Sequence, residues 1–328
     1  MKKALRVLIT GGAGYVGSVL SGQLLSRGYK VRVLDCLYFG GESILGYLSN
    51  PNFDFRYGDI RKKVDLEKAV EDIDAVIHLA AIVGDPACSQ QPQLARETNL
   101  DASMMLYEVC QKSGTVRRFV FASTCSNYGK MKGVEYVDET SPLCPISLYA
   151  ELKVSFEEFL LESKTSDDFI PTALRFATVY GISPRMRFDL TVNEFTKDAA
   201  LGRELVIYGE QFWRPYCHVE DIARACVLVL ESPAELVDHE VFGVGGTEEN
   251  YRKKMIVEEI LRFLPSTKVR YVHKEEDPRD YRVNFSKIEE QLGFKPIKRV
   301  SDGVQEVIFL IRNKILRDPD SGVYRNSR

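Results

Sequence analysis

A glycine pattern near the N-terminus constrains the fold of this chain more than any other feature. Gly11, Gly14 and Gly17 recur at every third position, directly after the apolar run 5–9 and at the start of a helical pattern. Glycines at this spacing allow a tight turn and a close approach of the backbone to a pyrophosphate, and the helix N-terminus offers free N–H groups to the phosphates. A glycine-rich hairpin gives the same letters where no strand and helix flank them. Because both flanks are present, the pattern predicts a dinucleotide-binding loop.

An acidic residue at the end of the next apolar run indicates which dinucleotide binds. Asp35 follows the run 31–34, about 20 residues after the glycines, where a carboxylate can accept hydrogen bonds from both ribose hydroxyls of NAD. The same carboxylate would repel the 2′-phosphate of NADP. The alternative, a solvated Asp in a strand-to-loop turn, is common in isolation but does not explain this position. The sequence therefore predicts NAD as the cofactor.

Short β-branched runs alternate with amphipathic stretches through the first half of the chain. The runs lie at 5–9, 31–34, 53–57, 75–79 and 119–122. Alternation of this kind is typical of an α/β fold, and we predict a Rossmann-type, doubly wound parallel sheet with helices on both faces. After residue 176 the pattern loosens into unevenly spaced turns, helices and short strands, which predicts a smaller α+β substrate domain.

The predicted domain boundaries follow from this change of pattern. Residues 1–175 are assigned to the NAD-binding domain, to which 217–240 is expected to return, and residues 176–216 and 241–316 to the substrate domain. The polar segment 317–328 is predicted to be a flexible tail.

The two longest helical patterns run over 93–113 and 148–163. Their apolar positions exceed one narrow stripe, which indicates either the helix–helix seam of a homodimer or burial within a large monomer. The pattern alone does not separate these two interpretations, and we predict a homodimer that forms through the two helices.

Composition excludes several classes of partner and site. The chain has 328 residues and a formal net charge of −3 with interspersed acids and bases, so no basic surface for nucleic acid or an anionic membrane is expected. Its seven cysteines are odd in number and form no C-x-x-C pair, which predicts neither a disulfide framework nor a zinc site. No segment approaches the roughly 20 apolar residues of a membrane span. We therefore predict a soluble cytoplasmic protein without a metal.

A tyrosine and a lysine placed four residues apart indicate the chemistry. Tyr149 and Lys153 share one face of a predicted helix, and Thr124 ends a strand some 25 residues earlier, so that its hydroxyl can meet the phenol at the edge of the sheet. A phenol with a pKa of about 10 is a poor base at neutral pH unless nearby positive charge favours the phenolate. Lys153 and the nicotinamide can supply that charge while Thr124 holds a substrate oxygen. An amphipathic helix with a surface lysine is the alternative, and the cofactor loop speaks against it.

These blocks together resemble the extended short-chain dehydrogenases/reductases, especially their nucleotide-sugar epimerases and dehydratases. The resemblance covers nearly the whole chain and adds blocks at 58–60, 78–81, 128–129 and 174–181. It implies that Tyr149 is the general base, that Lys153 also binds the nicotinamide ribose and that Thr124 orients the sugar hydroxyl. The predicted cofactor contacts are Gly11, Gly14, Tyr15, Val16, Gly17, Asp35, Asp59, Ile60, Leu79, Ala80, Ala81, Asn99, Ser123, Tyr149 and Lys153.

The second half of the chain carries residues that the resemblance assigns to a nucleotide diphosphate. The segment 213–221, with Arg214, resembles the family's Arg-aromatic segment, and Arg279 resembles its second phosphate arginine. Bidentate arginine donors suit a diphosphate. Arg185 and Arg187 either join these two or are ordinary surface arginines. The predicted substrate contacts are Thr124, Thr178, Arg187, Arg214 and Arg279, whereas Cys217 and His218 lack further ligands at metal spacing and His218 is predicted to be structural.

Several positions depart from the family pattern. Cys125 and Ser126 stand where the dehydratases carry the Asp-Glu pair that eliminates water, which disfavours a 4,6-dehydratase. Cys125 is either a base or a packed core thiol, and we favour the thiol. Thr178 replaces a usual asparagine and Asn127 a usual aliphatic residue, so the substrate contacts are expected to differ. Asp85 either faces the sugar or caps the helix that follows it.

The leading hypothesis is an NAD-dependent nucleotide-sugar epimerase that oxidises a sugar hydroxyl transiently and returns the hydride to the other face. A nucleotide-sugar ketoreductase or dehydrogenase uses the same residues and differs in exchanging its cofactor. A catalytically inactive NAD-binding regulator or scaffold is the alternative from another class. The presence of Thr124, Tyr149 and Lys153 together speaks against it, because a binding module does not need all three.

Overall fold

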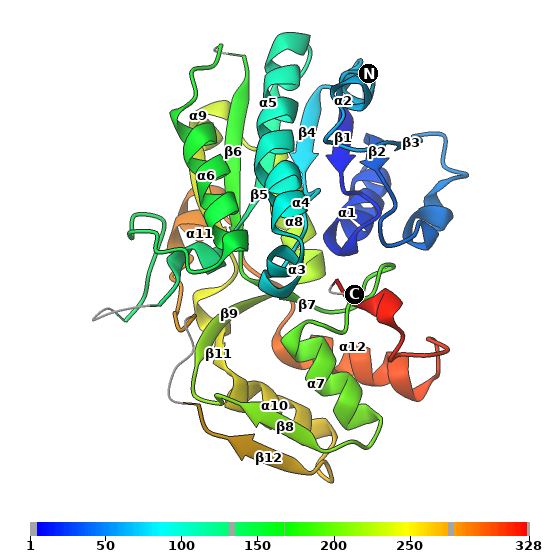
Figure 1. Ribbon diagram of the computed structural model, residues 1–328, viewed down its shortest axis with the longest axis vertical. Coiled ribbons are helices and arrows are strands. Elements are labelled where there is room, and N and C mark those ends of the chain that lie inside the picture. The colour runs from blue at the N-terminus through cyan, green and yellow to red at the C-terminus, as the bar shows by residue number, and fades with distance from the viewer. Residues whose placement is uncertain (1–4, 131–134, 167, 275–278, 327–328) are drawn as a thin grey trace.

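The computed structural model describes residues 5–130, 135–166, 168–274 and 279–326. Within them the chain forms two lobes, and the larger one is built on a sheet of seven parallel strands (Figure 1). The strand order is β10-β6-β5-β4-β1-β2-β3, with β1 Arg6–Thr10, β2 Lys30–Asp35, β3 Phe53–Tyr57, β4 Ala75–His78, β5 Arg118–Thr124, β6 Ile170–Phe176 and β10 Glu240–Val244. The five strands predicted in the first half are all present, with ends that shift by at most two residues.

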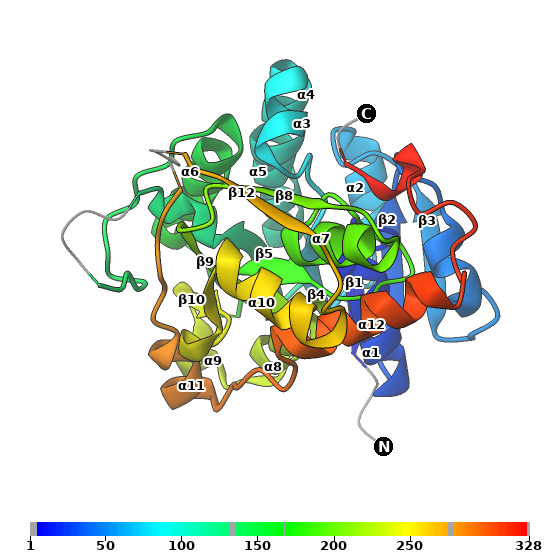
Figure 2. The ribbon, with the colours of Figure 1, turned by 90° about the horizontal axis from the view of Figure 1, so that it is seen from below.

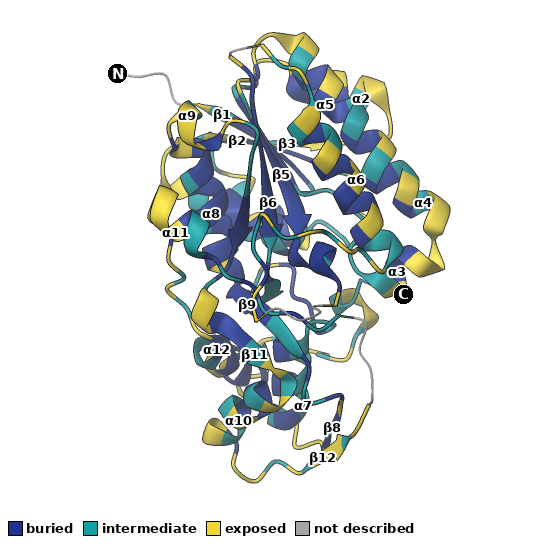
Figure 3. Cartoon of the chain, turned by 90° about the vertical axis from the view of Figure 1, so that its left-hand side faces the viewer, coloured by how far each residue is buried: buried dark blue, intermediate teal, exposed yellow. Residues whose placement is uncertain are grey.

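Helices cover both faces of this sheet, which confirms the predicted Rossmann-type arrangement. One face packs against α1 (Tyr15–Ser26), α8 (Val219–Glu231) and α11 (Ser286–Leu292). The other face packs against α2 (Lys63–Val70), α5 (Ala102–Ser113) and α6 (Leu148–Glu162). Apart from the edge strand β3, the strands between them are mostly buried (Figure 3), as expected for a parallel sheet covered on both sides. Shorter elements connect them: η1 (Glu42–Tyr47), α3 (Asp85–Gln90), α4 (Pro92–Arg96), η2 (Glu97–Asp101), η3 (Cys125–Tyr128) and α9 (Ala234–Val237).

The parallel register brings the carboxyl ends of the strands to one edge. Thr10 at the end of β1 pairs with His78 at the end of β4, and Thr124 at the end of β5 pairs with Phe176 at the end of β6. The glycine loop, Asp35 and Thr124 therefore all lie at the same edge, facing the second lobe. This edge is where open α/β sheets bind their ligands.

The smaller lobe lies below that edge in Figure 1 and toward the viewer in Figure 2, and it mixes helices with two small sheets. The helices are α7 (Thr191–Ala200), α10 (Lys253–Phe263) and α12 (Val300–Arg312), which enclose a core of their own. One sheet pairs β8 (Leu205–Tyr208) with β12 (Val269–Val272), and the other has the order β11-β9-β7, formed by Asn250–Arg252, Trp213–His218 and Thr178–Tyr180. Two short turns of helix, η4 (Thr247–Glu249) and η5 (Gly322–Tyr324), complete the described elements.

The predicted division into domains stays a prediction, but the course of the chain differs from it in one respect. β10 pairs with β6 in the large sheet, and α11 packs against β10. Apart from Glu240, both elements fall in the stretch 241–316 that was assigned to the substrate domain. Phe242 and Val244 of β10 are fully buried in the core beneath the large sheet, which gives the physical reason for this longer return.

The C-terminal segment makes contacts that the sequence analysis did not anticipate. The flexible tail predicted over 317–328 stays a prediction, and residues 327–328 of it lie outside the described part of the chain. Asp320 accepts hydrogen bonds from Lys197 Nζ and Arg203 Nη1, both at 2.8 Å. These ion pairs connect positions more than a hundred residues apart, so no local pattern revealed them.

The long helices bury their apolar positions within the monomer. Leu106, Val109, Phe156 and Leu160 belong to the core on the α2, α5 and α6 face of the sheet. The exposed stripe of α6 instead carries Glu151, Ser155, Glu158 and Glu162. Monomer burial therefore accounts for the apolar excess, and the homodimer stays a prediction. No helix among the described residues is long and apolar enough to cross a membrane.

Candidate active site

The glycine loop joins β1 to α1 in a form that only glycines permit. Gly11 has a φ of +73°, and a Cβ there would lie 2.8 Å from the backbone of Ala80. A Cβ on Gly17 would lie 2.3 Å from the carbonyl oxygen of Gly11. Gly14 is the N-cap of α1, and no side chain caps the helix. The loop therefore presents the backbone N–H groups of a helix N-terminus to the edge of the sheet, which fits the pyrophosphate of a dinucleotide.

Asp35 is held against this loop by two backbone N–H groups. Its Oδ2 accepts a hydrogen bond from Ala13 N at 3.0 Å, and its Oδ1 accepts one from Leu37 N at 2.8 Å. Burial raises the pKa of the Asp35 carboxyl, and the two N–H donors oppose that rise. Each carboxylate oxygen keeps further acceptor capacity, which fits a pair of ribose hydroxyls.

The loop after β4 forms the opposite wall. Leu79 N donates to Thr10 O at 3.1 Å, and the backbone of Ala80 closes on Gly11. Asn99 pins the next residue, because its Oδ1 accepts from Ile82 N at 2.8 Å and its Nδ2 donates to Ile82 O at 2.9 Å. The Asn99 side chain is thus occupied in shaping this wall, which includes Ala81.

Four other predicted cofactor residues have surroundings that limit how they can bind. The Tyr15 hydroxyl donates to Gly181 O at 2.5 Å, in the second lobe, so it is already engaged within the protein. Asp59 is engaged in an ion pair with Arg61. Val16 and Ile60 pack into the cores on the two faces of the sheet. Their predicted contacts with a cofactor stay predictions.

The three predicted catalytic residues do meet at the sheet edge. Thr124 ends β5, Tyr149 lies in the first turn of α6, and a hydrogen bond joins the Thr124 hydroxyl to the Tyr149 phenol. Lys153 follows one turn later, with its Nζ donating to Ala122 O at 2.8 Å and lying 4.6 Å from the centre of the Phe121 ring. Burial lowers the pKa of Lys153 to about 8.

The protein groups around Tyr149 do not favour its phenolate form. Burial of the phenol raises the pKa of Tyr149 above its usual value, and Cys88 and Asp85 raise it further. The guanidinium of Arg187 and the hydrogen bond with Thr124 lower it, but by less. Phenolate formation therefore needs another positive charge, and an oxidised nicotinamide at this edge would provide one.

A buried polar network beneath these residues was missed by the sequence analysis. Ser123 Oγ, predicted to contact the cofactor, donates instead to Glu157 of α6. Glu157 pairs with Arg175 of β6 at 2.6 Å, and Arg175 Nη1 donates to the Tyr128 hydroxyl at 3.0 Å. Asn127 Nδ2 donates to Ser123 Oγ at 3.1 Å and so joins the network.

The sequence did contain one signal for this network. Glu157 stands four residues after Lys153 and thus continues the helix face of Tyr149.

The residues after Thr124 provide no acid–base pair. Cys125 Sγ donates to Arg175 O at 3.3 Å, and burial raises the pKa of the Cys125 thiol well above its usual value. Ser126 forms a hydrogen bond with the buried phenol of Tyr281. Cys125 is therefore the packed core thiol that the sequence analysis favoured.

Each of the predicted substrate arginines has a partner within the protein. Arg187 pairs with Asp189 at 2.7 Å, and Arg279 pairs with Asp85 of α3 at 2.7 Å. Arg214 stacks on the ring of Tyr281 with its guanidinium carbon 5.3 Å from the ring centre. Thr178 lies on β7, in register with Tyr216 of β9. Residues 277–278 of the Arg279 segment lie outside the described residues.

Asp85 was predicted either to face the sugar or to cap the helix that follows it, and its contacts combine features of both. It stands in the first turn of α3, and its carboxylate bridges two elements: Oδ1 accepts from Ser147 Oγ at 2.7 Å, and Oδ2 faces Arg279. Ser147 is the N-cap of α6, two residues before Tyr149. Asp85 thus contacts the predicted substrate residue Arg279 and helps to fix the start of α6.

His218 is structural, as predicted. Its Nε2 lies 2.8 Å from Glu306 Oε2, and its Nδ1 accepts from Glu220 N at 3.2 Å, which caps α8. No group of His, Cys, Asp and Glu side chains suited to a metal ion is found among the described residues.

Comparisons with known proteins agree with this geometry. Residues 7–245 match the model of the NAD dependent epimerase/dehydratase family. A UDP-glucose 4-epimerase from Lactobacillus helveticus is 30% identical over 77% of this chain and 80% of its own length. UDP-glucuronic acid decarboxylase 1 from Arabidopsis thaliana is 26% identical over 97% of this chain and 72% of its own length. The crystal structure of Thermus thermophilus UDP-glucose 4-epimerase with NAD superposes with a TM-score of 0.81 at 27% identity, covering 94% of this chain and 99% of that one.

Proposed function

This chain belongs to the NAD dependent epimerase/dehydratase family, and we propose that within it the protein is a nucleotide-sugar epimerase. Membership makes it an NAD-dependent enzyme. The proposed reaction inverts one carbon of the sugar by transient oxidation, so that the cofactor returns to its starting state in every cycle.

The contact between Thr124 and Tyr149 carries the proposal. It places a proton acceptor and a hydroxyl side by side at the sheet edge, next to the glycine loop and above Lys153. A sugar hydroxyl that binds there can hydrogen-bond to Thr124 while it gives its proton to Tyr149. The neighbouring Cys125 and Ser126 are engaged with the protein itself, which supports an epimerase over a dehydratase.

The proposed steps conserve both proton and hydride. NAD, held by the glycine loop and Asp35, would supply a reversible hydride acceptor for the sugar carbon. Tyr149 takes the hydroxyl proton during oxidation and returns it during reduction, and Lys153 with Thr124 holds the phenol and the substrate oxygen in place. Between the two halves the keto sugar turns over within the cleft, so its other face receives the hydride. The arginines Arg187, Arg214 and Arg279 are proposed to hold the diphosphate.

A panel of UDP-, GDP-, CDP- and dTDP-sugars, incubated with the protein without added cofactor, tests this proposal. An isomerised sugar at constant NAD content supports the epimerase. Stoichiometric consumption of NADH only when a keto sugar is supplied supports the ketoreductase, and release of CO₂ from UDP-glucuronic acid supports a decarboxylase. No turnover with any sugar supports the scaffold.

Substitution of the phenol tests the assigned role directly. Tyr149→Phe is expected to reduce turnover by about two to four orders of magnitude, because general acid–base catalysis contributes on that scale. Tyr57→Phe, at an exposed tyrosine of β3, is the matched control and leaves turnover unchanged. Equal turnover in both variants contradicts the role of Tyr149.

A further inference from the structure

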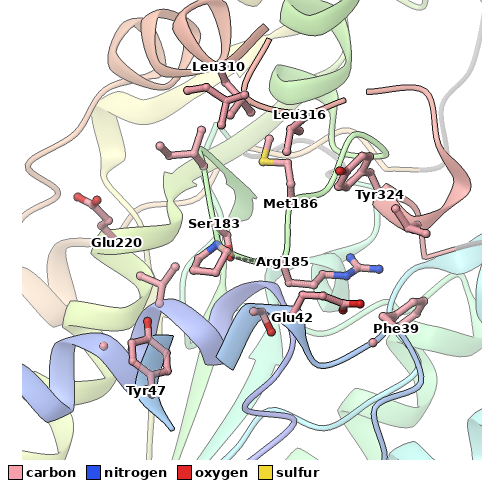
Figure 4. Close-up of a pocket in the computed structure, with 18 of the residues that line it drawn as sticks. Phe39, Glu42, Tyr47, Ser183, Arg185, Met186, Glu220, Leu310, Leu316 and Tyr324 are labelled. Carbon is pink, nitrogen blue, oxygen red and sulfur yellow. Dashed lines mark hydrogen bonds between the residues drawn. The ribbon is translucent and has the colours of Figure 1, made fainter. Parts of the chain in front are cut away.

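The C-terminal segment 317–326, here called the strap, is anchored to the second lobe. Besides the ion pairs of Asp320, Tyr324 O accepts from Phe188 N at 2.8 Å, and the rings of Tyr324 and Phe188 lie 5.7 Å apart. One side of the strap lines a cavity of about 1110 Å³, whose other walls include residues of α1, the segment 39–47 and the segment 182–186 (Figure 4). There Met186 lies beside Tyr324, and the Arg185 guanidinium lies 4.2 Å from the centre of the Phe39 ring.

The end of the strap crosses from one lobe to the other. Asn326 N donates to Asp189 Oδ2 at 3.1 Å in the second lobe, and Asn326 Nδ2 donates to Val83 O at 3.4 Å in the large lobe. Val83 directly follows the wall formed by residues 79–82. Figures 1 and 3 both show this end of the chain between the lobes, beside α3. A single residue therefore connects the two sides of the cleft.

Asp189, which binds the end of the strap, also binds Arg187. Arg187, bonded to Asp189 at 3.0 and 2.7 Å, has its guanidinium carbon 6.0 Å from the centre of the Tyr15 ring at the start of α1. Its charge also acts on Tyr149. Arg187 is thus near both Tyr15, which follows the glycine loop, and Tyr149. A dinucleotide that reaches from that loop to Tyr149 passes through the same stretch of the cleft.

The side-chain oxygen of Asn326 is not satisfied by the part of the chain that the structure describes. Its Oδ1 is buried and has no hydrogen-bond partner among the described residues, although its N and Nδ2 both donate. Leaving a buried acceptor unsatisfied costs about 1–3 kcal/mol, so such an atom usually meets a donor from water or a ligand. A dinucleotide carries suitable donors in its ribose hydroxyls and its carboxamide.

We propose that Asn326 is a cofactor-binding residue and that the strap retains NAD in the cleft. The strap ties Val83 and Asp189 together across the cofactor, and Asn326 Oδ1 accepts a hydrogen bond from it. Slow release suits an enzyme whose cofactor is restored in every cycle. The inference depends on NAD binding alone, and it holds whichever sugar is the substrate.

The release rate of the cofactor tests the proposal without any sugar. The protein is loaded with NADH, excess NAD is added, and the fall in NADH fluorescence gives the dissociation rate constant. Loss of one hydrogen bond from Asn326→Ala is expected to raise this constant by about tenfold. Asn313→Ala is the control, because Asn313 donates to Phe309 O at 2.9 Å on the exposed end of α12, outside the strap.

Two outcomes overturn the proposal. The first is an equal release rate in Asn326→Ala and Asn313→Ala. The second is a lower thermal midpoint of cofactor-free Asn326→Ala than of cofactor-free Asn313→Ala, which assigns Asn326 a structural role. Support requires equal midpoints without cofactor and a smaller rise of the midpoint with NAD in Asn326→Ala. A failed sugar assay leaves these results unchanged, so the proposed epimerase activity and the strap are tested separately.

Discussion

Two cations, Lys153 and Arg175, are buried near Tyr149, and they are stabilised in different ways. Arg175 on β6 is paired with Glu157, whose side chain is only 1% exposed. Lys153 on α6 is equally buried, but among the described residues no carboxylate lies within ion-pair distance of it. Its partners are the Ala122 carbonyl and the face of the Phe121 ring.

This difference distinguishes two kinds of buried charge. The charge of Arg175 is fixed by its ion pair, whereas that of Lys153 can change with its surroundings. Burial tends to lower the pKa of Arg175, but the Glu157 carboxylate outweighs it and raises that pKa, so Arg175 stays charged at every accessible pH. Burial lowers the pKa of Lys153 to about 8, within reach of ordinary conditions. A cation that is held by a carboxylate fixes the floor of the site. A cation without one responds to pH and to the charge of whatever binds above it.

Removal of the carboxylate from the paired cation is expected to have the largest effect. Glu157→Ala leaves Arg175 charged, buried and without its carboxylate, which should lower the free energy of unfolding by about 3–5 kcal/mol. Urea denaturation measures it. The double variant Glu157→Leu with Arg175→Met, which removes both charges, should recover most of the loss. A loss below about 1 kcal/mol in the single variant contradicts the structural role of this pair.

For Lys153 we predict a smaller effect on the free energy of unfolding, and one that depends on pH. The folded state lowers the pKa of Lys153 from 10.5 to about 8, so the folded protein binds this proton less readily than the unfolded chain does. The free energy of unfolding should therefore rise relative to that of Lys153→Met as the pH increases from about 8 to 10.5, by about 3 kcal/mol in total. Below pH 8 the cost of burying the charge is present in full.

Urea denaturation of both proteins between pH 7 and 10 measures this difference. Lys164→Met, at an exposed lysine, is the control, and its stability curve should run parallel to that of the unchanged protein. Parallel curves for Lys153→Met as well would show that Lys153 does not titrate in this range.

The same contrast shows which parts of the site a sequence reveals. The glycine loop, Asp35 and the pair Tyr149 and Lys153 are recognisable because their spacing along the chain is set by local geometry, a turn or one helix face. The strand order and the two covered faces follow from alternation of strands and helices. These features were predicted, and the fold confirms the sheet on which they lie.

The missed features depend on contacts between distant segments. Ser123 and Arg175 meet Glu157 only because β5 and β6 are neighbours in the sheet. Asn326 and Val83 are 243 positions apart, and the polar composition of the last residues suggested a flexible end. Such pairings require the tertiary structure, because neither partner carries a local pattern.

The partly exposed ion pair of Asp85 and Arg279 contrasts with both buried cations, and we expect it to have the smallest effect on stability. Asp85 and Arg279 are 23% and 38% exposed, so Asp85→Asn should change the free energy of unfolding by less than about 1 kcal/mol. Its effect should appear in substrate binding, because the proposed diphosphate must compete with Asp85 for the guanidinium of Arg279. Asp85→Asn is then expected to lower KM by up to about fivefold, the worth of an exposed ion pair.

Arg279→Ala provides the matched measurement, since it removes the guanidinium itself and should raise KM. Steady-state kinetics with the sugar identified by the panel compares the two variants. Opposite shifts in KM indicate that Asp85 competes with substrate for Arg279. If Asp85→Asn raises KM as Arg279→Ala does, Asp85 binds the substrate directly, and its carboxylate belongs with the sugar contacts rather than with the ion pairs of the cleft.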